Sequence, residues 1–263
     1  MPNGEGPSPQ ERLPDPHNVL VELTLVPRTG ATVSGAAAPA PVPGGGPQIR
    51  ILRTLEVDEY ETPPTAADIV PLTAPRAAPA DNNFEGTARK AAKLSIVDAP
   101  VEPFNDVNDL IATFPAHSDM VAKNISTDAD SDRVDEEKRN VRVKAFIYAA
   151  SMESDNDFHL IIGRDPSKAA KYMTAEISGL PPNNADSFDT LDAARSAYLE
   201  FFGDGLPGTG YDFYDPPIQI EIQGSIFWDA SHAHGGRPGP TKLRVKMPVV
   251  WEIHPVTKIV FEP

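Results

Sequence analysis

The run NVRVKAFIYAAS over residues 140–151 constrains the fold most, because its two faces differ without a break. One face is aliphatic and consists of Val141, Val143, Ala145 and Ile147. The other face is basic and aromatic and consists of Arg142, Lys144, Phe146 and Tyr148. A period of two residues is typical of a β-strand with one buried face. The segment therefore predicts a half-buried strand.

The chain after this strand continues with short apolar segments separated by turns. Strands are predicted over 157–164, 172–177, 218–228 and 249–254, the last of them extended or paired by 258–261. A helix is predicted over 190–202, with Asp189 or Thr190 as its N-cap and Gly203 at its end. Three strands, a helix and two strands form the order of an OB-fold barrel, in which the helix closes one end. Gly224 within the fourth strand fits a β-bulge.

The N-terminal part is built differently, because 17 of the 29 prolines precede Asn105. Strands are predicted over 19–26 and 49–60, with a low-complexity Ala/Pro/Gly segment over 30–46 between them. Residues 87–97 predict a short helix that leads into a strand. We therefore expect a loosely organised, partly disordered region over 1–104 and an OB-like β-barrel domain over 140–263. Between them, residues 105–139 are expected to form a charged, solvated connector with short helices at 106–114 and 130–139.

Composition narrows the classes of partner. The formal net charge of -15 opposes nucleic acid and anionic membranes at long range, so single-stranded nucleic acid is disfavoured as a partner. The absence of cysteine excludes disulfides, thiolate metal sites and a cysteine nucleophile. Neither a membrane span nor a secretory signal is visible, and a cytoplasmic location is expected.

Histidines suggest a first candidate site. His232 and His234 are two residues apart in a glycine-rich loop, and Glu252 and His254 share one face of the last predicted strand. Together with Asp229 these side chains suit zinc or another transition ion. The alternative is a solvated loop pair and a strand-end histidine, with no metal or other cofactor.

Two further groups of side chains are candidates. Arg142, Lys144, Phe146 and Tyr148 predict a ligand-binding face, because basic and aromatic side chains on an OB barrel bind anionic chains and stack bases. The alternative is an aromatic pair packed beneath the N-terminal segment. The acids Glu153, Asp155 and Asp157 either bind calcium or form a solvated acidic turn.

Two short sequences resemble a group of uncharacterised bacterial proteins. The first follows the pattern D-x-D-[FY]-H-L and comprises Asp155, Asp157, Phe158, His159 and Leu160. The second is W-E-I-H-P-V over residues 251–256. The resemblance implies relatedness and an OB-like domain, without an activity. The acidic turn 155–157 is also loosely similar to that of thermonuclease-like phosphodiesterases, whose arginine and glutamate pattern is not recognisable here.

Three functions are compatible with these observations. The first is a non-enzymatic module that binds a ligand or protein partner through strand 140–151 and the loop 229–239. The second is a metal-dependent hydrolase or phosphodiesterase that uses the histidine and acid cluster. The third is a structural component of a larger assembly, on which an extended N-terminal arm docks.

Overall fold

The computed structural model describes residues 12–15, 19, 21–25, 48–58, 81–234 and 237–262 of the chain. Its strands form one eight-stranded sheet in the order β1-β2-β7-β8-β6-β5-β4-β3. In chain order they are β1 (Val21–Leu25), β2 (Ile49–Arg53), β3 (Val101–Phe104), β4 (Asn140–Met152), β5 (Phe158–Gly163), β6 (Tyr172–Ile177), β7 (Asp212–Trp228) and β8 (Trp251–Phe261). The prediction of a strand-rich fold is confirmed.

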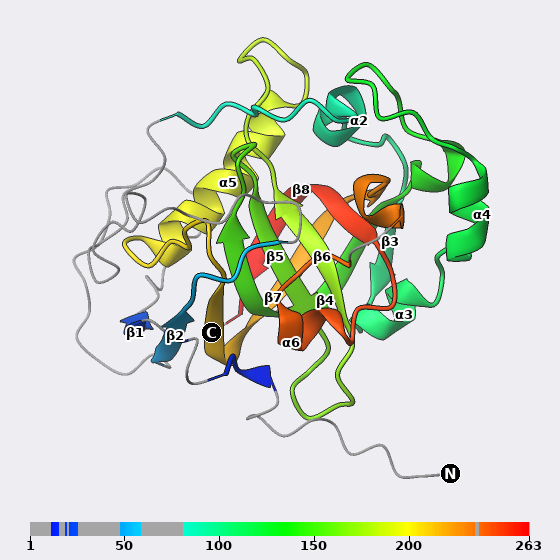
Figure 1. The fold of residues 1–263 in the computed structure, drawn as a ribbon. Helices are drawn as coiled ribbons and strands as arrows, with labels where there is room; N and C mark the ends of the chain where they lie inside the picture. The colour runs from blue at the N-terminus through cyan, green and yellow to red at the C-terminus, as the bar shows by residue number, and fades with distance from the viewer. Residues whose placement is uncertain are drawn as a thin grey trace, which may run out of the picture.

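Five of the strands close into a ring, which occupies the centre of Figure 1. Because β4 pairs with both β5 and β7, the hydrogen-bonded order runs β4–β5–β6–β8–β7 and back to β4. All neighbours in the ring are antiparallel except β6 and β8, which are parallel. Strands β1 and β2 extend the sheet from β7, and β3 runs parallel to β4.

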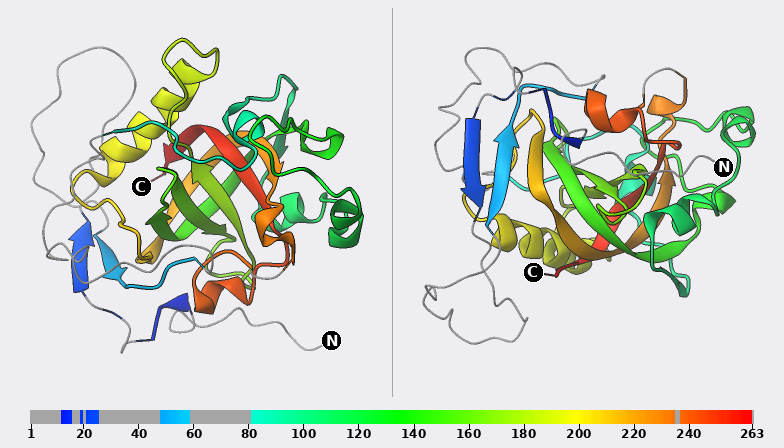
Figure 2. Two further views of the ribbon diagram at one scale, coloured as in Figure 1. Left: turned by 45° about the horizontal axis from the view of Figure 1, so that its top comes forward. Right: turned by 90° about the horizontal axis from the view of Figure 1, so that it is seen from below.

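Helices surround the ring. They are α2 (Lys90–Leu94), α3 (Val107–Ile111), α4 (His117–Ala122), α5 (Phe188–Phe202) and α6 (Thr241–Arg244), with 3-10 turns η2 (Asp135–Glu137) and η3 (Ser231–His234). The long helix α5 lies on one side of the strands, and α3 and α4 lie on the opposite side (Figures 1 and 2). The predicted helix at 190–202 is thus confirmed, with a start two residues earlier. None of the described helices is long and apolar enough to cross a membrane.

The predicted aliphatic face of β4 lies in the main core. Its four residues are at most 1% exposed: Val141, Val143, Ala145 and Ile147. Tyr198 and Phe202 of α5 belong to the same core cluster, and so do Trp228 of β7 and Trp251 of β8. The alternation of β4 therefore points one face inward, as predicted, and buries it against the apolar faces of the other ring strands and of α5.

The predicted bulge at Gly224 is confirmed, because the register between β7 and β8 shifts on both sides of this residue. Strand β7 begins at Asp212, six residues earlier than predicted. Residues 214–217 have no partner on β4, since Ile147 pairs with Ile218 while Ala149 pairs with Phe213. Pro216 and Pro217, which cannot donate hydrogen bonds to a neighbouring strand, fall in this gap.

The helix predicted over 130–139 does not form, and the segment is solvated only in part, with four of its ten residues exposed and two buried. Only the 3-10 turn η2 forms there, and Glu137 is fully buried. Its carboxylate accepts two hydrogen bonds of 2.7 Å from the Arg89 guanidinium. Arg133 is 9% exposed and donates to the carbonyl oxygens of Ile226 and His254. Two buried charged side chains therefore anchor the segment to the rest of the protein, whereas its remaining charges are exposed or half-buried.

The N-terminal region is described only in part. Of the predicted strands, 19–26 contains β1 and 49–60 contains β2, and the predicted helix at 87–97 contains α2. The low-complexity segment 30–46 lies outside the described residues. The two described strands continue the ring's own sheet through β7.

Candidate metal centre

The faces of β5, β6 and β8 that point away from the main core carry acids and histidines. His159 of β5 is paired with Glu176 of β6. Thr174 of β6 is paired with Glu252 of β8. Because residues i and i+2 share one face of a strand, His254 follows Glu252 and comes to lie beside Glu176. The strand registers thus place two acids and two histidines side by side.

The turn between β4 and β5 adds further carboxylates at the edge of this face. Asn156 has a φ of 78° and reverses the chain, and the amide of Glu153 donates to the carbonyl oxygen of Asp157 at 2.9 Å. The Asp157 carboxylate accepts a hydrogen bond of 2.6 Å from the Gly179 amide, just beyond β6. The acidic turn predicted over 153–157 is therefore folded against the sheet, with Asp157 fully buried.

Other segments cover the same face. Asp58 follows β2, and its Oδ1 lies 3.4 Å from Nε2 of His232 in η3. The Nδ1 of His232 makes a short contact with the Asp229 carboxylate. From α2, the Lys93 ammonium lies 3.9 Å from Oε2 of Glu176. These segments, which come from both halves of the chain, cover the acids and histidines of β5, β6 and β8 that would otherwise face solvent.

A first cluster, the His254 group, comprises Asp157, Glu176 and His254. One possible ligand atom from each lies within 4.8 Å of the other two. Nδ1 of His254 is 2.5 Å from Oε2 of Glu176, and Nε2 is 3.5 Å from Oδ2 of Asp157. Oε2 of Glu252 lies 3.7 Å from the same Nδ1. All four side chains are at most 3% exposed.

The polar atoms of the His254 group are poorly satisfied. Neither ring nitrogen of His254 has a hydrogen-bond partner of acceptable geometry among the described residues, and the same holds for Oδ2 of Asp157 and Oε2 of both Glu176 and Glu252. Buried polar atoms are nearly always paired. Nδ1 of His254 faces Oε2 of Glu176 and of Glu252, whereas Nε2 faces Oδ2 of Asp157. One ion can therefore bind through only one of the two ring nitrogens. Buried carboxylates and an imidazole without well-formed hydrogen bonds are nevertheless a feature expected of a cation site.

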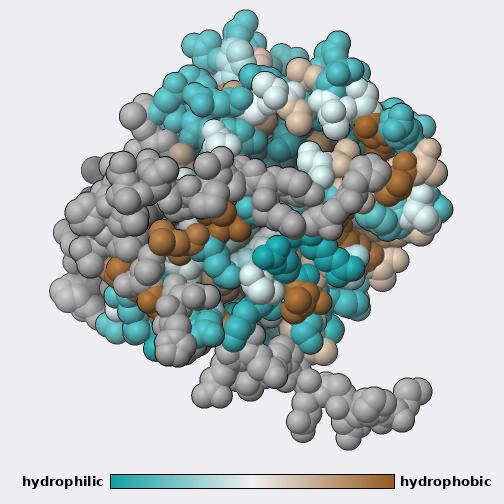
Figure 3. All heavy atoms as spheres, viewed as in Figure 1, coloured by the Kyte–Doolittle hydropathy of each residue, from teal (hydrophilic) through white to brown (hydrophobic). Residues whose placement is uncertain are grey.

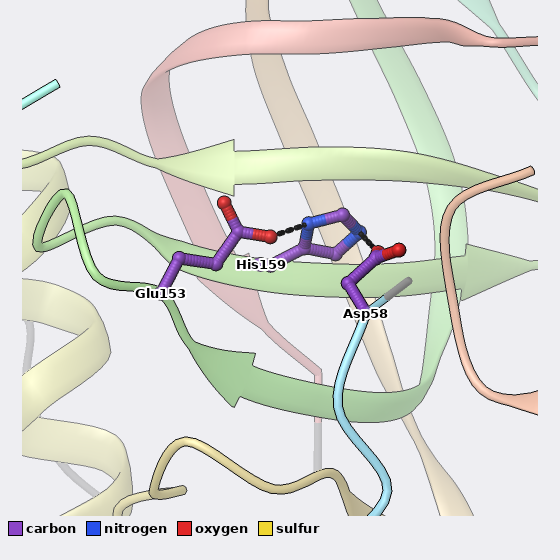
Figure 4. A group of neighbouring side chains, drawn as sticks. All are labelled: Asp58, Glu153 and His159. Carbon is purple, nitrogen blue, oxygen red and sulfur yellow. Dashed lines mark hydrogen bonds and ion pairs between the residues drawn. The ribbon is translucent and has the colours of Figure 1, made fainter. Parts of the chain in front are cut away.

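A second cluster, the His159 group, comprises Asp58, Glu153 and His159 (Figure 4). The imidazole lies between the two carboxylates, one from the β4–β5 turn and one from the segment after β2. Nδ1 makes a short contact with Glu153, and Nε2 lies 4.0 Å from Oδ2 of Asp58. The same Nδ1 is 3.5 Å from Oε1 of Glu176, so the His159 and His254 groups are neighbours.

The carboxylates of this region outnumber its cations. Burial raises the pKa of Asp157 and of Glu252 well above the usual range, and it raises the pKa of Glu153 to about 7. In each case neighbouring negative charges such as Glu176 act in the same direction. A bound proton or a bound cation therefore stabilises these groups.

The basic groups respond differently. Burial lowers the pKa of His254, which leaves the ring neutral with a lone pair free for a metal. For His159 the effect of burial is outweighed by Glu153, and its pKa rises to about 9. Burial also acts against the charge of Lys93, but Glu176 and Asp155 outweigh it and hold the Lys93 pKa well above its usual value.

The five predicted metal ligands fall into two pairs and one residue whose side chain is not described. Glu252 and His254 lie together in the His254 group, on one face of β8 as predicted. Asp229 and His232 contact each other beside Asp58. His234 lies in η3, and its side chain is outside the described part of the structure. Whether these five residues hold one ion stays a prediction.

The predicted ligand-binding face of β4 is uneven. Arg142 and Lys144 are exposed, and Nε of Arg142 lies 3.8 Å from the Glu221 carboxylate. Phe146 is half-buried. Tyr148 is 4% exposed, stacks edge-on against Tyr172 and donates to the carbonyl oxygen of Arg164. The aromatic end of this face is thus packed inside the protein.

Sequence reasoning missed Glu176, Asp58 and Lys93. Glu176 could have been found from the sequence, because it lies on the polar face of the predicted strand YMTAEI. On the neighbouring strand it is paired with His159. Asp58 and Lys93 carry no such signal, since the segment after β2 and helix α2 lie far from β5, β6 and β8 in sequence. No family model, curated protein or solved structure matches the chain.

Proposed function

We propose that the protein is a non-enzymatic binding module whose ring of strands is fastened by a buried divalent metal ion in the His254 group. The observation that carries this proposal is the convergence of unpaired buried atoms from Asp157, Glu176 and His254, with Glu252 beside them. Leaving such atoms without a partner is costly, and a cation bound through one nitrogen of His254 and the nearby carboxylate oxygens lowers that cost.

The chemistry of the donor set favours a particular kind of ion. One neutral imidazole and two or three carboxylates suit zinc or manganese better than calcium, which prefers oxygen ligands alone. The four donor residues are at most 3% exposed, so the site is enclosed. Enclosed sites hold structural ions, whereas catalytic sites keep an open position for water or substrate. Enclosure therefore weighs against the hydrolase or phosphodiesterase alternative.

The position of the ligands suggests what the ion does. The ladder between β6 and β8 has only two residue pairs, whereas that between β5 and β6 has six. Glu176 comes from β6, and Glu252 and His254 come from β8. An ion bound by these three side chains bridges the shortest seam of the ring and holds it closed.

The strand order supports an OB-like barrel as the finer description of the ring. Strands β4, β5 and β6 are followed by α5 and then by β7 and β8, with β6 parallel to β8. The two motifs that resemble uncharacterised bacterial proteins contribute Asp157 and His159, and Glu252 and His254, to the proposed centre. This convergence favours a common role for both motifs in that group.

The alternative of an assembly component receives less support. A component of an assembly is expected to expose a large apolar patch where it contacts its neighbours. On the face drawn in Figure 3, hydrophobic residues lie in small groups between hydrophilic ones. Few large hydrophobic side chains are exposed in the described part of the chain: Leu55, Val101, Val245 and Val260.

Metal content tests the proposal directly. Tag-free protein is expected to retain stoichiometric zinc or manganese, and after chelation added Zn²⁺ should raise the thermal midpoint of unfolding. His254→Gln should abolish the Zn²⁺-induced shift, whereas His117→Gln, which changes an exposed histidine, should preserve it. Equal unfolding midpoints of the chelated wild-type protein with and without Zn²⁺ would count against a metal centre.

A further inference from the structure

We infer that the centre holds two divalent metal ions, one in the His254 group and one in the His159 group, with the Glu176 carboxylate bridging them. This inference rests on the proposed function and specifies the stoichiometry and ligands of the site. The second ion would be held by Glu153 and by Nδ1 of His159, while Asp58 faces Nε2 on the other side of the ring.

The geometry of Glu176 carries the bridging role. Its two carboxylate oxygens face different histidines: Oε1 is 3.5 Å from Nδ1 of His159, and Oε2 is 2.5 Å from Nδ1 of His254. Glu176 is 2% exposed. A buried carboxylate that presents one oxygen to each of two imidazoles has the arrangement of a ligand shared between two ions.

The His159 group offers donors on the side of the ring that faces Glu176. Nδ1 of His159 contacts Glu153 and lies 3.5 Å from Oε1 of Glu176, so these three side chains meet at one point. Nε2 faces Asp58 on the other side of the ring, at 4.0 Å from Oδ2 (Figure 4). His159 is only 1% exposed, so an ion bound by Nδ1 would be enclosed.

Carboxylates gather closely in this region. Seven of them lie here, namely Asp58, Glu153, Asp155, Asp157, Glu176, Asp229 and Glu252. Lys93 and His232 are the basic groups that contact them from the covering segments. The region therefore offers enough carboxylate oxygens for two ions, and the geometry of Glu176 and His159 carries the inference.

The competing arrangement has a proton on His159 in place of the second ion. A protonated ring between Glu153 and Asp58 forms two ion pairs and supplies one positive charge. The two arrangements differ in stoichiometry, because the protonated form binds one metal ion per chain and the bridged form binds two.

The experiment counts ions in tag-free protein that has been stripped with a chelator and titrated with Zn²⁺. We expect two ions per wild-type chain, one in His159→Gln and in Glu153→Gln, and two in the control His117→Gln. Reconstitution with Mn²⁺ should give a spin-coupled electron paramagnetic resonance spectrum in the wild-type protein. In His159→Gln it should give the spectrum of an isolated ion.

The outcomes separate this inference from the proposed function. One ion in the wild-type protein, kept by His159→Gln and lost in His254→Gln, would overturn the second ion and leave the metal-binding module standing. No ion would overturn both. Two ions without magnetic coupling would overturn the bridging role of Glu176. The wild-type stoichiometry decides these points even where a variant fails to fold.

Discussion

Arg53 and Asp212 form an ion pair that is enclosed between β2 and β7, with side-chain exposures of 1% and 0%. Nε and one terminal nitrogen of the guanidinium donate to the carboxylate, and the same terminal nitrogen donates to the carbonyl oxygen of Leu206. Removing one partner leaves the other charge buried without compensation, so Asp212→Ala should destabilise the protein by about 3–5 kcal/mol. Chemical denaturation measures this difference.

The same strand pair provides a matched control. Arg50 is paired with Asp215 in the register that joins Arg53 to Asp212, and their atoms approach to 2.6 Å. Their side chains are 43% and 34% exposed, so Asp215→Ala should cost less than about 1 kcal/mol. If the two alanine variants lost equal stability, burial would not be the reason for the effect.

At the residue scale, the sequence predicted part of the candidate site. Alternation along WEIHPV placed Glu252 and His254 on one face, and the structure confirms it. Polar residues on the outward face of a strand usually face water, which hid the importance of Glu176. Its burial results from Asp58 and Lys93, whose approach depends on how distant segments fold over the sheet. The alternation of polar and apolar residues along one strand cannot show contacts with segments that are distant in sequence.

At the scale of the strand, Gly224 allows β7 and β8 to approach closely. A Cβ atom at this position would lie 2.3 Å from the carbonyl oxygen of Pro255 and 2.7 Å from Cγ2 of Ile253. Gly224→Ala should therefore destabilise the protein by about 1–3 kcal/mol through overpacking, as measured by urea unfolding. Glu221→Ala in the same strand is the control, with an expected change below about 0.5 kcal/mol. Wild-type stability in Gly224→Ala would mean that the bulge relaxes freely.

At the scale of the helix, Asp106 begins α3 and joins it to the β5–β6 turn. Its carboxylate accepts from the Asn108 amide and from Arg164 and Lys168. Burial raises its pKa, but the hydrogen bonds from Arg164 and Lys168 outweigh this effect and hold the pKa at about 2. Asp106→Asn keeps the cap but loses the charge pairs, and should cost less than about 1 kcal/mol at pH 7.

The sign of this effect follows from linkage. Because the pKa of Asp106 is lower in the folded than in the unfolded protein, its contribution is complete above about pH 4 and is lost as the pH falls towards 2. The stability difference between Asp106→Asn and wild type should therefore shrink over this interval in denaturation curves. A difference that stayed constant down to pH 2 would assign the loss to packing.

The elements themselves were largely predictable. Period-two patterns located β4, β5 and β6 to within a residue at either end, because each strand is bounded by polar turns. The start of β7 was missed, since two prolines precede Ile218 and prolines argue against a strand. The structure accommodates them in residues 214–217, which are unpaired on the β4 side. The burial of Glu137 within the predicted connector was missed, because its pairing with Arg89, a residue distant in sequence, is what allows this charge to be buried.

For the whole molecule, the buried acids predict an unusual pH dependence once metal is removed. Glu153 and His159 have pKa values raised to about 7 and about 9 in the folded protein. A group with a raised pKa in the folded state stabilises that state at low pH and loses this contribution as the pH rises through the folded value. Besides burial and their mutual contact, the groups that shift these two pKa values are Asp58, Asp155 and Glu176.

The thermal midpoint of the chelated protein should therefore fall as the pH rises from about 5 to 9, first through Glu153 and then through His159. Zn²⁺-loaded protein should show the opposite trend over the lower half of this range, because metal ligands must be deprotonated and affinity increases with pH. In chelated Glu153→Gln the thermal midpoint should fall less between pH 5 and 7 than in the chelated wild-type protein. This comparison distinguishes the effect of Glu153 from general repulsion among the other acids. His254, whose pKa is lowered, acts in the opposite direction between pH 5 and 7, so the comparison with Glu153→Gln and not the wild-type slope alone is decisive. If Glu153→Gln left this slope unchanged, Glu153 would have no raised pKa in the fold, and the electrostatic argument for a cation at this place would fail.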